Sequence, residues 1–445
     1  MIALVGFASF TSCCKDDELV LNGTDCSIIS FDLVDGQNRL AAQIYPESLL
    51  VIADINQDFS ALKAEVVVSE GAIIEPDPAT VQDWSKPMNF KVTAANGLES
   101  REYAYEVQLE NFSQYCTENI YLTTQKEVDE FGTHGYTKAY SIIVNDSEES
   151  QITDLSPLKS LITIDKNLTI KNFHGKEIVL DQLKSVSTFE VFSNTLETLS
   201  AAALTEVNNL YIGFISEDVM TPVMGSMNTL NFKSLERVKG NMILMFNNQI
   251  QDYAIQGFDN LKQLDGDTWF NFPSANLKTF SKLEKALNFK IGGNVKSFEG
   301  FENFKTIDGI FMTEFLRGAE SLLPFAPTKV STVCLSNSQT VNTLDFCKNL
   351  TEVDNFEISG AYPIKNLKGI ETIKRINYGL FIKYTQIENL NELSNLEYVG
   401  RTIMFKYNNK LVDYSGLKKC LEDFDGEWIV EYNMSNPPIK EIIGE

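Results

Sequence analysis

Apolar residues recur along positions 151–445 in two alternating rhythms. From Leu390 to Val399 four apolar residues stand three positions apart, and after a gap of four positions Ile403 and Phe405 stand two apart. Three-residue spacing suits a tight helical or turn-like segment, whereas two-residue spacing suits a short strand. One such unit cannot bury its own apolar side, so it requires copies stacked beside it.

Copies of this unit occur throughout the region. Pairs of mostly apolar residues two positions apart predict strands that start at residues 168, 189, 210, 242, 268, 289, 310, 333, 356, 380, 403 and 428. All steps but one between these starts are 21 to 26 residues long, within the range of about 20–29 residues found in leucine-rich repeats. The spacing therefore predicts a repeat solenoid of about twelve turns.

The one longer step, of 32 residues, contains an insertion at about Gly213–Thr229. Insertions in repeat proteins map to loops on one face, which is often the binding face. A loop of this length is also tolerated without any function, because the entropic cost of closing a loop grows slowly with its length. Both interpretations stay open.

Residues 26–111 have a different pattern of apolar residues. Short β-branched or aromatic runs are separated by turn signals such as Asp35-Gly36 and Asn96-Gly97. Runs at this spacing predict a β-sandwich, and the Asn-Gly pair between two such runs predicts a hairpin. The segment from Trp84 to Tyr103 resembles immunoglobulin-like modules that precede binding domains in bacterial surface lipoproteins, where their role is usually that of a spacer.

Residues 112–150 separate this module from the repeats. Thr124 and Glu127 have the spacing of a capping box for a short helix over 125–131, and a candidate strand, YSIIVND, follows. The arrangement resembles the amino-terminal cap of bacterial solenoids related to receptor L-domains. A cap is also needed physically, because an open solenoid end exposes core and strand edges.

The unit x-F/L-x-x-L-x-x-I/V-x-G-x-L-x-I resembles the leucine-rich repeats of receptor L-domains. The resemblance covers 151–445 and implies a mainly β chain: an Ig-like β-sandwich followed by a right-handed leucine-rich-repeat solenoid of about twelve turns. It is specific for fold and weak for function. The asparagine that ends the strand in typical repeats is irregular here; the residues that fit it are Asn172, Asn247, Asn271 and Asn408.

The first residues resemble a bacterial lipoprotein signal peptide, residues 1–12, because a short apolar run is followed by Thr11, Ser12 and Cys13. The resemblance implies that Cys13 is lipidated, with Cys14 as the alternative anchor and 13–25 as a tether. The Lys-Asp-Asp-Glu run after the cysteines resembles the export signal of surface lipoproteins in Bacteroidota-type bacteria. We therefore expect an outer-membrane protein, exposed at the cell surface, that meets the membrane through its lipid alone.

Charge and motifs narrow the possible chemistry. The net charge of −24 repels phosphate backbones, so nucleic acid is a poor partner. The chain has two histidines, His134 and His174, each beside a glycine that suggests a loop, and it has no metalloprotease, nucleophile-elbow or P-loop motif. We predict no catalytic residue, no metal site and no cofactor, and hence a protein that is not an enzyme.

The cysteines after the signal peptide give two further expectations. Cys347 and Cys420 stand where other repeats place a core Leu, Ile or Phe, which predicts small buried side chains. Cys26 and Cys116 bracket the first module, and a disulfide between them is open to an exported protein. The spacing does not decide whether that pair forms.

In each predicted strand the residue between the two inward positions points out from the sheet. Seven of these twelve outward residues are large and apolar or aromatic, and the full set is Thr169, Glu190, Tyr211, Ile243, Trp269, Lys290, Phe311, Cys334, Glu357, Phe381, Met404 and Ile429. A sheet face that meets only water is mainly polar. An exposed apolar stripe with polar neighbours is typical of a binding surface.

We identify Tyr211, Trp269, Phe311 and Phe381 as candidate ligand contacts, with the insertion near Met220 as a possible flank. The favoured function is non-catalytic binding or adhesion to a host or surface protein or to a polysaccharide, since aromatic rings serve both. The alternatives are an assembly subunit whose stripe packs against another protein and, less favoured, a glycan-active enzyme. A register shifted by one residue in some repeats would instead move these side chains inside.

Overall fold

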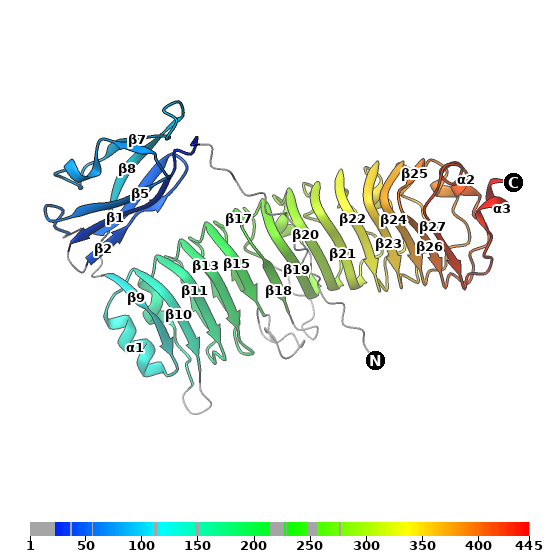
Figure 1. Ribbon diagram of the computed structural model, residues 1–445. Helices are drawn as coiled ribbons and strands as arrows, with labels where there is room; N and C mark the ends of the chain where they lie inside the picture. The colour runs from blue at the N-terminus through cyan, green and yellow to red at the C-terminus, as the bar shows by residue number, and fades with distance from the viewer. Residues whose placement is uncertain are drawn as a thin grey trace. The chain divides into compact units, whose positions relative to one another are not determined.

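The computed structural model describes residues 23–35, 38–55, 57–110, 114–146, 151–213, 227, 229–246, 256–275 and 277–444 (Figure 1). The chain forms two compact units, Met1–Ser113 and Gln114–Glu445, and each unit has its own hydrophobic core. The predicted signal peptide, Cys13, Cys14 and the segment around Met220 lie outside the described residues.

The N-terminal unit consists of two β-sheets. The three-stranded sheet has the order β2-β1-β5, and the five-stranded sheet has the order β3-β4-β8-β7-β6. Their bounds are β1 Ile28–Asp35, β2 Asn38–Ala41, β3 Gln43–Ile44, β4 Ser48–Asp54, β5 Lys63–Val68, β6 Ile73–Glu75, β7 Met88–Thr93 and β8 Ser100–Glu110. The predicted hairpin joins β7 to β8, and Gly97 there has the positive φ of +70° that its turn requires.

An aromatic cluster fills the core of this unit. Phe31, Trp84, Phe90 and Tyr105 are at most 1% exposed, and the rings of Trp84 and Tyr105 meet edge to face with centroids 5.4 Å apart. The Tyr105 hydroxyl donates a hydrogen bond of 2.8 Å to the Trp84 carbonyl, so its polar end is satisfied inside the core.

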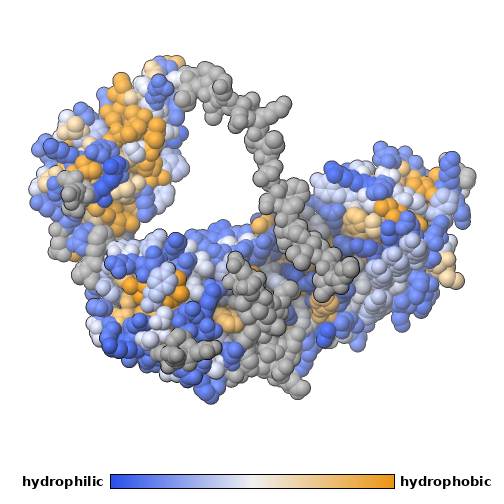
Figure 2. All heavy atoms as spheres, turned by 60° about the horizontal axis from the view of Figure 1, so that its bottom comes forward, coloured by the Kyte–Doolittle hydropathy of each residue, from blue (hydrophilic) through white to orange (hydrophobic). Residues whose placement is uncertain are grey.

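Apolar side chains also reach the surface of the N-terminal unit. Figure 2 shows hydrophobic atoms gathered in a band on one side of it. Its most exposed large apolar residues are Ile29, Ile55, Val67, Ile73 and Leu98. These residues belong to the N-terminal unit and are not part of the solenoid face described below.

The C-terminal unit is a β-solenoid whose main sheet has sixteen strands, ordered from β9 to β27 along the unit (Figure 1). The strands are β9 Tyr115–Leu122, β10 Lys138–Asn145, β11 Thr163–Lys171, β13 Ser185–Phe192, β15 Glu206–Ile212, β17 Arg237–Val238, β18 Met242–Met245, β19 Gln263–Ala275, β20 Lys285–Val295, β21 Thr306–Gly318, β22 Lys329–Ser336, β23 Glu352–Ser359, β24 Arg375–Lys383, β25 Tyr398–Val399, β26 Thr402–Lys406 and β27 Glu427–Glu431. Neighbouring strands are parallel throughout, for example β10 with β11 and β26 with β27. The prediction of a mainly β chain with a solenoid of about twelve turns is confirmed.

Smaller elements close the turns and the ends. A second parallel sheet contains β12 Glu177–Val179, β14 Thr198–Ser200 and β16 Thr229–Asn231. Short 3₁₀ helices form η1 Pro78–Thr80 in the N-terminal unit and η3 Ser156–Ser160, η4 Lys278–Phe280, η5 Asp345–Cys347, η6 Asn391–Leu393 and η7 Ser415–Leu417 in the solenoid. The α-helices are α1 Gln125–Thr133, α2 Lys418–Leu421 and α3 Ile439–Ile443.

The three-residue apolar rhythm has a direct structural cause. The N–H of Leu393 bonds to the carbonyl of Leu390 at 2.9 Å, and the N–H of Leu396 bonds to the carbonyl of Leu393 at 2.8 Å. Two successive i to i+3 turns place every third side chain on the same side. All three leucines are buried, at most 1% exposed.

Helix α1 begins with the predicted capping box. The Thr124 hydroxyl accepts from the Glu127 N–H at 3.2 Å, and the Glu127 carboxylate accepts from the Thr124 N–H at 3.1 Å. Hydrogen bonds to its carboxylate lower the pKa of Glu127, and the bond from the Thr123 N–H has the largest effect. The helix buries Val128 and Phe131 in the solenoid core.

Cys347 and Cys420 are core residues, 0% and 3% exposed, as predicted. Burial raises the pKa of the Cys420 thiol to about 12, and it raises the pKa of Cys347 well above its ordinary value. Cys26 and Cys116 are both buried free thiols in this structure.

The predicted register is wrong in one strand, β21. Phe311, expected on the outer face, is 0% exposed and packs against Phe325 with ring centroids 4.9 Å apart, whereas Ile310 is 40% exposed. The pairing of β21 with β20 and β22 shifts after Ile307 because the strand contains a bulge there. Three consecutive apolar residues, Ile310 to Met312, fit either register, and the bulge brings Phe311 to the core.

The bulge yields a stability prediction. Phe311→Ala should destabilise the solenoid by about 3–5 kcal/mol, because it leaves a cavity in the core. Met312→Ala, at the half-buried neighbouring position, should cost about 1 kcal/mol or less. Chemical denaturation of the full chain measures both, and equal effects would contradict the register.

Candidate functional site

The outer face of the main sheet carries one continuous column of side chains, here called the outward column. Strand pairing aligns its members directly from rung to rung. They are Tyr121, Ile143, Thr169, Glu190, Tyr211, Ile243, Trp269, Lys290, Met312, Cys334, Glu357, Phe381, Met404 and Ile429. Tyr211, Trp269 and Phe381 are therefore in the predicted column and half-buried, and Met312 stands where Phe311 was expected.

Trp269 is already in contact with a cation of its own chain. Lys290, the next residue of the outward column, places its Nζ 3.9 Å from the centroid of the indole ring and forms an ion pair with Glu314. A cation–π contact at an exposed site is worth about 0.5–1 kcal/mol. A ligand that stacks on this face of Trp269 must first displace the lysine.

Phe381 lies over the backbone of its own strand. A Cβ atom on Gly379 would come within 2.3 Å of Cε2 of the ring, so the glycine provides the room that the ring occupies. The next two members of the outward column, Met404 and Ile429, are half-buried. Three adjacent rungs at the C-terminal end of the sheet thus present a continuous apolar row.

The lysines beside the outward column are paired with glutamates. Lys171 lies 3.7 Å from Glu190, Lys383 lies 2.8 Å from Glu357, and Lys406 lies 3.0 Å from Glu431. Such surface pairs add little stability. Their effect on the site is electrostatic: each positive charge is compensated by a neighbouring carboxylate, so these lysines add no net positive charge to the face.

An aromatic stack that sequence reasoning missed lies just past the ends of β24, β26 and β27. It consists of Tyr384, Tyr407 and Tyr432, here called the tyrosine stack. Neighbouring ring centroids are 4.7 and 4.9 Å apart, and neighbouring ring planes are within 5° of parallel. The three side chains are 40%, 43% and 66% exposed, in that order.

All three tyrosines have left-handed backbone conformations, with φ of +54°, +58° and +58°. The residues that follow them hold the turn in place. The Asn408 side chain donates to the carbonyl of Ile382 at 2.9 Å and accepts from the N–H of Thr385 at 3.1 Å. The Asn433 side chain donates to the carbonyl of Phe405 at 2.8 Å.

The sequence contains a signal for the stack. Three consecutive repeats end in I-K-Y-T (382–385), F-K-Y-N (405–408) and V-E-Y-N (430–433). The tyrosine follows the strand, where the two-residue alternation stops. A pattern based on alternation alone therefore passes over it.

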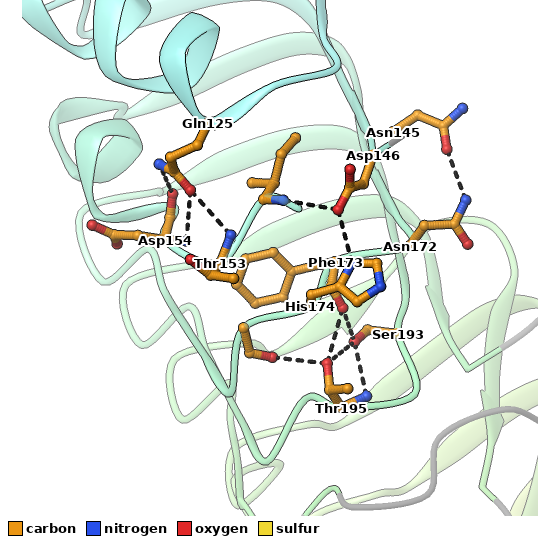
Figure 3. Close-up of polar contacts among 12 residues, drawn as sticks. Gln125, Asn145, Asp146, Thr153, Asp154, Asn172, Phe173, His174, Ser193 and Thr195 are labelled. Atoms are coloured by element: carbon orange, nitrogen blue, oxygen red, sulfur yellow. Dashed lines mark hydrogen bonds and ion pairs between the residues drawn. The ribbon is translucent and has the colours of Figure 1, made fainter. Parts of the chain in front are cut away.

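A separate polar cluster lies near the N-terminal end of the solenoid (Figure 3). Nδ1 of His174 is 2.7 Å from Oδ2 of Asp146, and this oxygen also accepts from the N–H of Ile152 at 2.8 Å. Ser193 lies in the same cluster, which thus contains the three residue types of a hydrolase triad.

The hydrogen bonds of Ser193 give it a structural role. Its hydroxyl donates to the carbonyl of Phe173 at 2.6 Å and accepts from the N–H groups of Thr195 and Leu196, both at 3.2 Å. The side chain is 1% exposed. An oxygen engaged in this way closes a turn and is not presented to a substrate.

The described residues show neither a metal-binding cluster nor a membrane-spanning helix. They contain no cluster of three or more His, Cys, Asp or Glu residues arranged to hold a metal ion. In the same part of the chain, no helix has the length and apolar character needed to cross a membrane.

Residues 28–107 match the family model described as SGBP, N-terminal, the amino-terminal module of surface glycan-binding proteins. The match lies within the two sheets of the N-terminal unit. No curated protein matches the chain significantly. The similarity favours a glycan-binding role at the cell surface that is not catalytic.

The structural role of Ser193 can be tested. Ser193→Ala should destabilise the solenoid by about 1–3 kcal/mol, because it leaves buried backbone groups without their partner. Ser394→Ala, at an exposed position, should change stability by about 0.5 kcal/mol or less. Denaturation curves would overturn the assignment if the two variants were equally stable.

Proposed function

We propose that this chain is a non-catalytic glycan-binding protein of the cell surface, whose solenoid binds a polysaccharide through the outer face of its main sheet. The observation that carries the proposal is the outward column, in which half-buried aromatic and apolar side chains, among them Tyr211, Trp269 and Phe381, recur along the sheet. The similarity of residues 28–107 to the SGBP N-terminal family supports the coarser part of the proposal, a non-catalytic glycan-binding role at the cell surface.

The chemistry next to the outward column suits a sugar. Two residues before the outward column in the sequence, Asn and Thr side chains of neighbouring rungs form hydrogen bonds with each other. Examples are Asn209 with Thr188 and Asn355 with Thr332. A sugar ring combines an apolar face with a rim of hydroxyl groups. Aromatic side chains beside amides and hydroxyls offer both kinds of contact, and pockets for small molecules use the same combination.

The outward column itself is better suited to binding than to hydrolysis. Glycoside hydrolysis needs two carboxyl groups that flank one bond, about 5–9.5 Å apart. The two glutamates of the outward column, Glu190 and Glu357, stand on strands β13 and β23, with six rungs between them. Each is paired with a lysine of the same face.

Binding can be measured by affinity electrophoresis and calorimetry of the mature protein with amylopectin, xyloglucan, galactomannan and polygalacturonate. We expect saturable binding to at least one polysaccharide. Trp269→Ala and Phe381→Ala should weaken it about tenfold or more, since loss of about 1.4 kcal/mol is tenfold. Tyr45→Ala, at an exposed site in the N-terminal unit, is the control and should change nothing.

A protein that bound none of these polysaccharides but bound host or surface proteins would refute glycan capture and favour adhesion. A mass that rises with protein concentration, with the same lack of binding, would instead favour the assembly role.

We also propose that Cys13 carries a lipid that anchors the protein to the outer membrane, on the basis of the Thr-Ser-Cys context. Cys13→Ser should release the protein into the soluble fraction of cells that export it. Cys14→Ser serves as the control and should leave it with the membranes. A Cys13→Ser protein that stays in the membrane fraction would contradict this anchor.

A further inference from the structure

We infer that the tyrosine stack is the principal contact surface for the polysaccharide and that the polysaccharide is uncharged. The inference rests on the proposed glycan-binding function and specifies its residues and its class of ligand. Backbone conformation, ring geometry and charge each support it.

The backbone conformation of the stack is unfavourable for tyrosine. The left-handed region costs an L-residue about 1–2 kcal/mol, and only Gly, Asn and Asp visit it routinely. At the aligned position of most other rungs the chain uses such residues, among them Gly293, Asn337 and Gly360, with φ of +81°, +50° and +71°, and Phe315, with φ of +50°, is an exception. Tyrosine is therefore not the residue that the turn itself favours.

The rings recover little of this cost by burial. They are 40–66% exposed, and aromatic pairs contribute about 0.5–1.5 kcal/mol each, with two pairs for three tyrosines. Strained residues that the surrounding structure holds in place are typical of functional sites. Here the side chains of Asn408 and Asn433 hold the turns, and what tyrosine adds is exposed aromatic surface.

The stack suits a polymer because it is periodic. Its neighbouring ring centroids lie 4.7 and 4.9 Å apart from rung to rung, and its ring planes stay nearly parallel. The three hydroxyl groups and ring edges thus form a regular ridge. The terminal ring, Tyr432, is 66% exposed against 43% for the middle ring, so Tyr432 presents the largest area for stacking with a sugar ring.

The apolar row of the same rungs widens this surface. Phe381, Met404 and Ile429 stand in the outward column of β24, β26 and β27, and the tyrosines follow three residues later. The side chains of Lys383 and Lys406 lie between the two rows. Their aliphatic stems continue the apolar surface while their charged ends meet glutamates.

Charge determines the class of glycan. Lys383 and Lys406 are compensated by Glu357 and Glu431, and the hydrogen bond to Glu431 raises the pKa of Lys406. The chain as a whole carries a net charge of −24. Because these two lysines are already compensated, they would not offset the repulsion that an anionic polysaccharide meets from the acidic chain, so an uncharged chain is favoured.

The decisive variant replaces Tyr384, Tyr407 and Tyr432 together with asparagine. Asparagine tolerates the left-handed conformation, so the denaturation midpoint should not fall. Affinity for the uncharged polysaccharide that the wild-type protein binds, among amylopectin, xyloglucan and galactomannan, should fall at least tenfold. The matched control is Phe315→Asn, at the aligned position three rungs earlier, where φ is +50° and the ring is 52% exposed; its affinity should be unchanged.

The outcomes separate the two proposals. A wild-type protein that binds no polysaccharide would overturn the proposed function and this inference with it. Binding that persists in the folded triple variant but is lost in Trp269→Ala would overturn the inference alone. A preference of the wild-type protein for polygalacturonate over the uncharged polysaccharides would overturn the ligand class.

Discussion

Backbone hydrogen bonding between parallel strands holds neighbouring rungs about 4.8 Å apart. This spacing sets the distances between side chains both in the core and on the outside of the solenoid. Inside, it brings one phenylalanine per turn against the next. Ring centroids are 5.4 to 6.1 Å apart along a continuous row that comprises Phe232, Phe258, Phe280, Phe301, Phe325 and Phe346. Outside, the same spacing sets the distances within the tyrosine stack.

This constraint explains why much of the fold was predictable. A repeating core must place an apolar residue at the same point of every turn, so the repeat is visible in the sequence. Each of the twelve predicted strands has a counterpart in the sheet, from β11 to β27. The three-residue rhythm reflects tight turns such as the pair around Leu393.

The errors arose where alternation carries no information. In β21 the run from Ile310 to Met312 is apolar at every position, and the bulge after Ile307 decided which residue enters the core. The tyrosine stack was missed because it begins one residue after the strands end. Three of the four predicted contact residues, Tyr211, Trp269 and Phe381, do stand in the outward column, but the sequence could not reveal the lysine that lies over Trp269.

The position of the stack at the end of the solenoid has a thermal consequence. An inner rung is supported by a neighbour on each side, whereas the last rung, β27, has one strand neighbour and the short cap that contains α3. That cap is held by the hydrogen bond of 3.1 Å from the Trp428 indole to the carbonyl of Pro437 and by the packing of Ile439, Ile442 and Ile443 against the solenoid core. Because the last rung has a strand neighbour on one side only, we expect the terminal rungs to open on warming before the phenylalanine row does, so that the tyrosine stack is lost while most of the secondary structure is still intact.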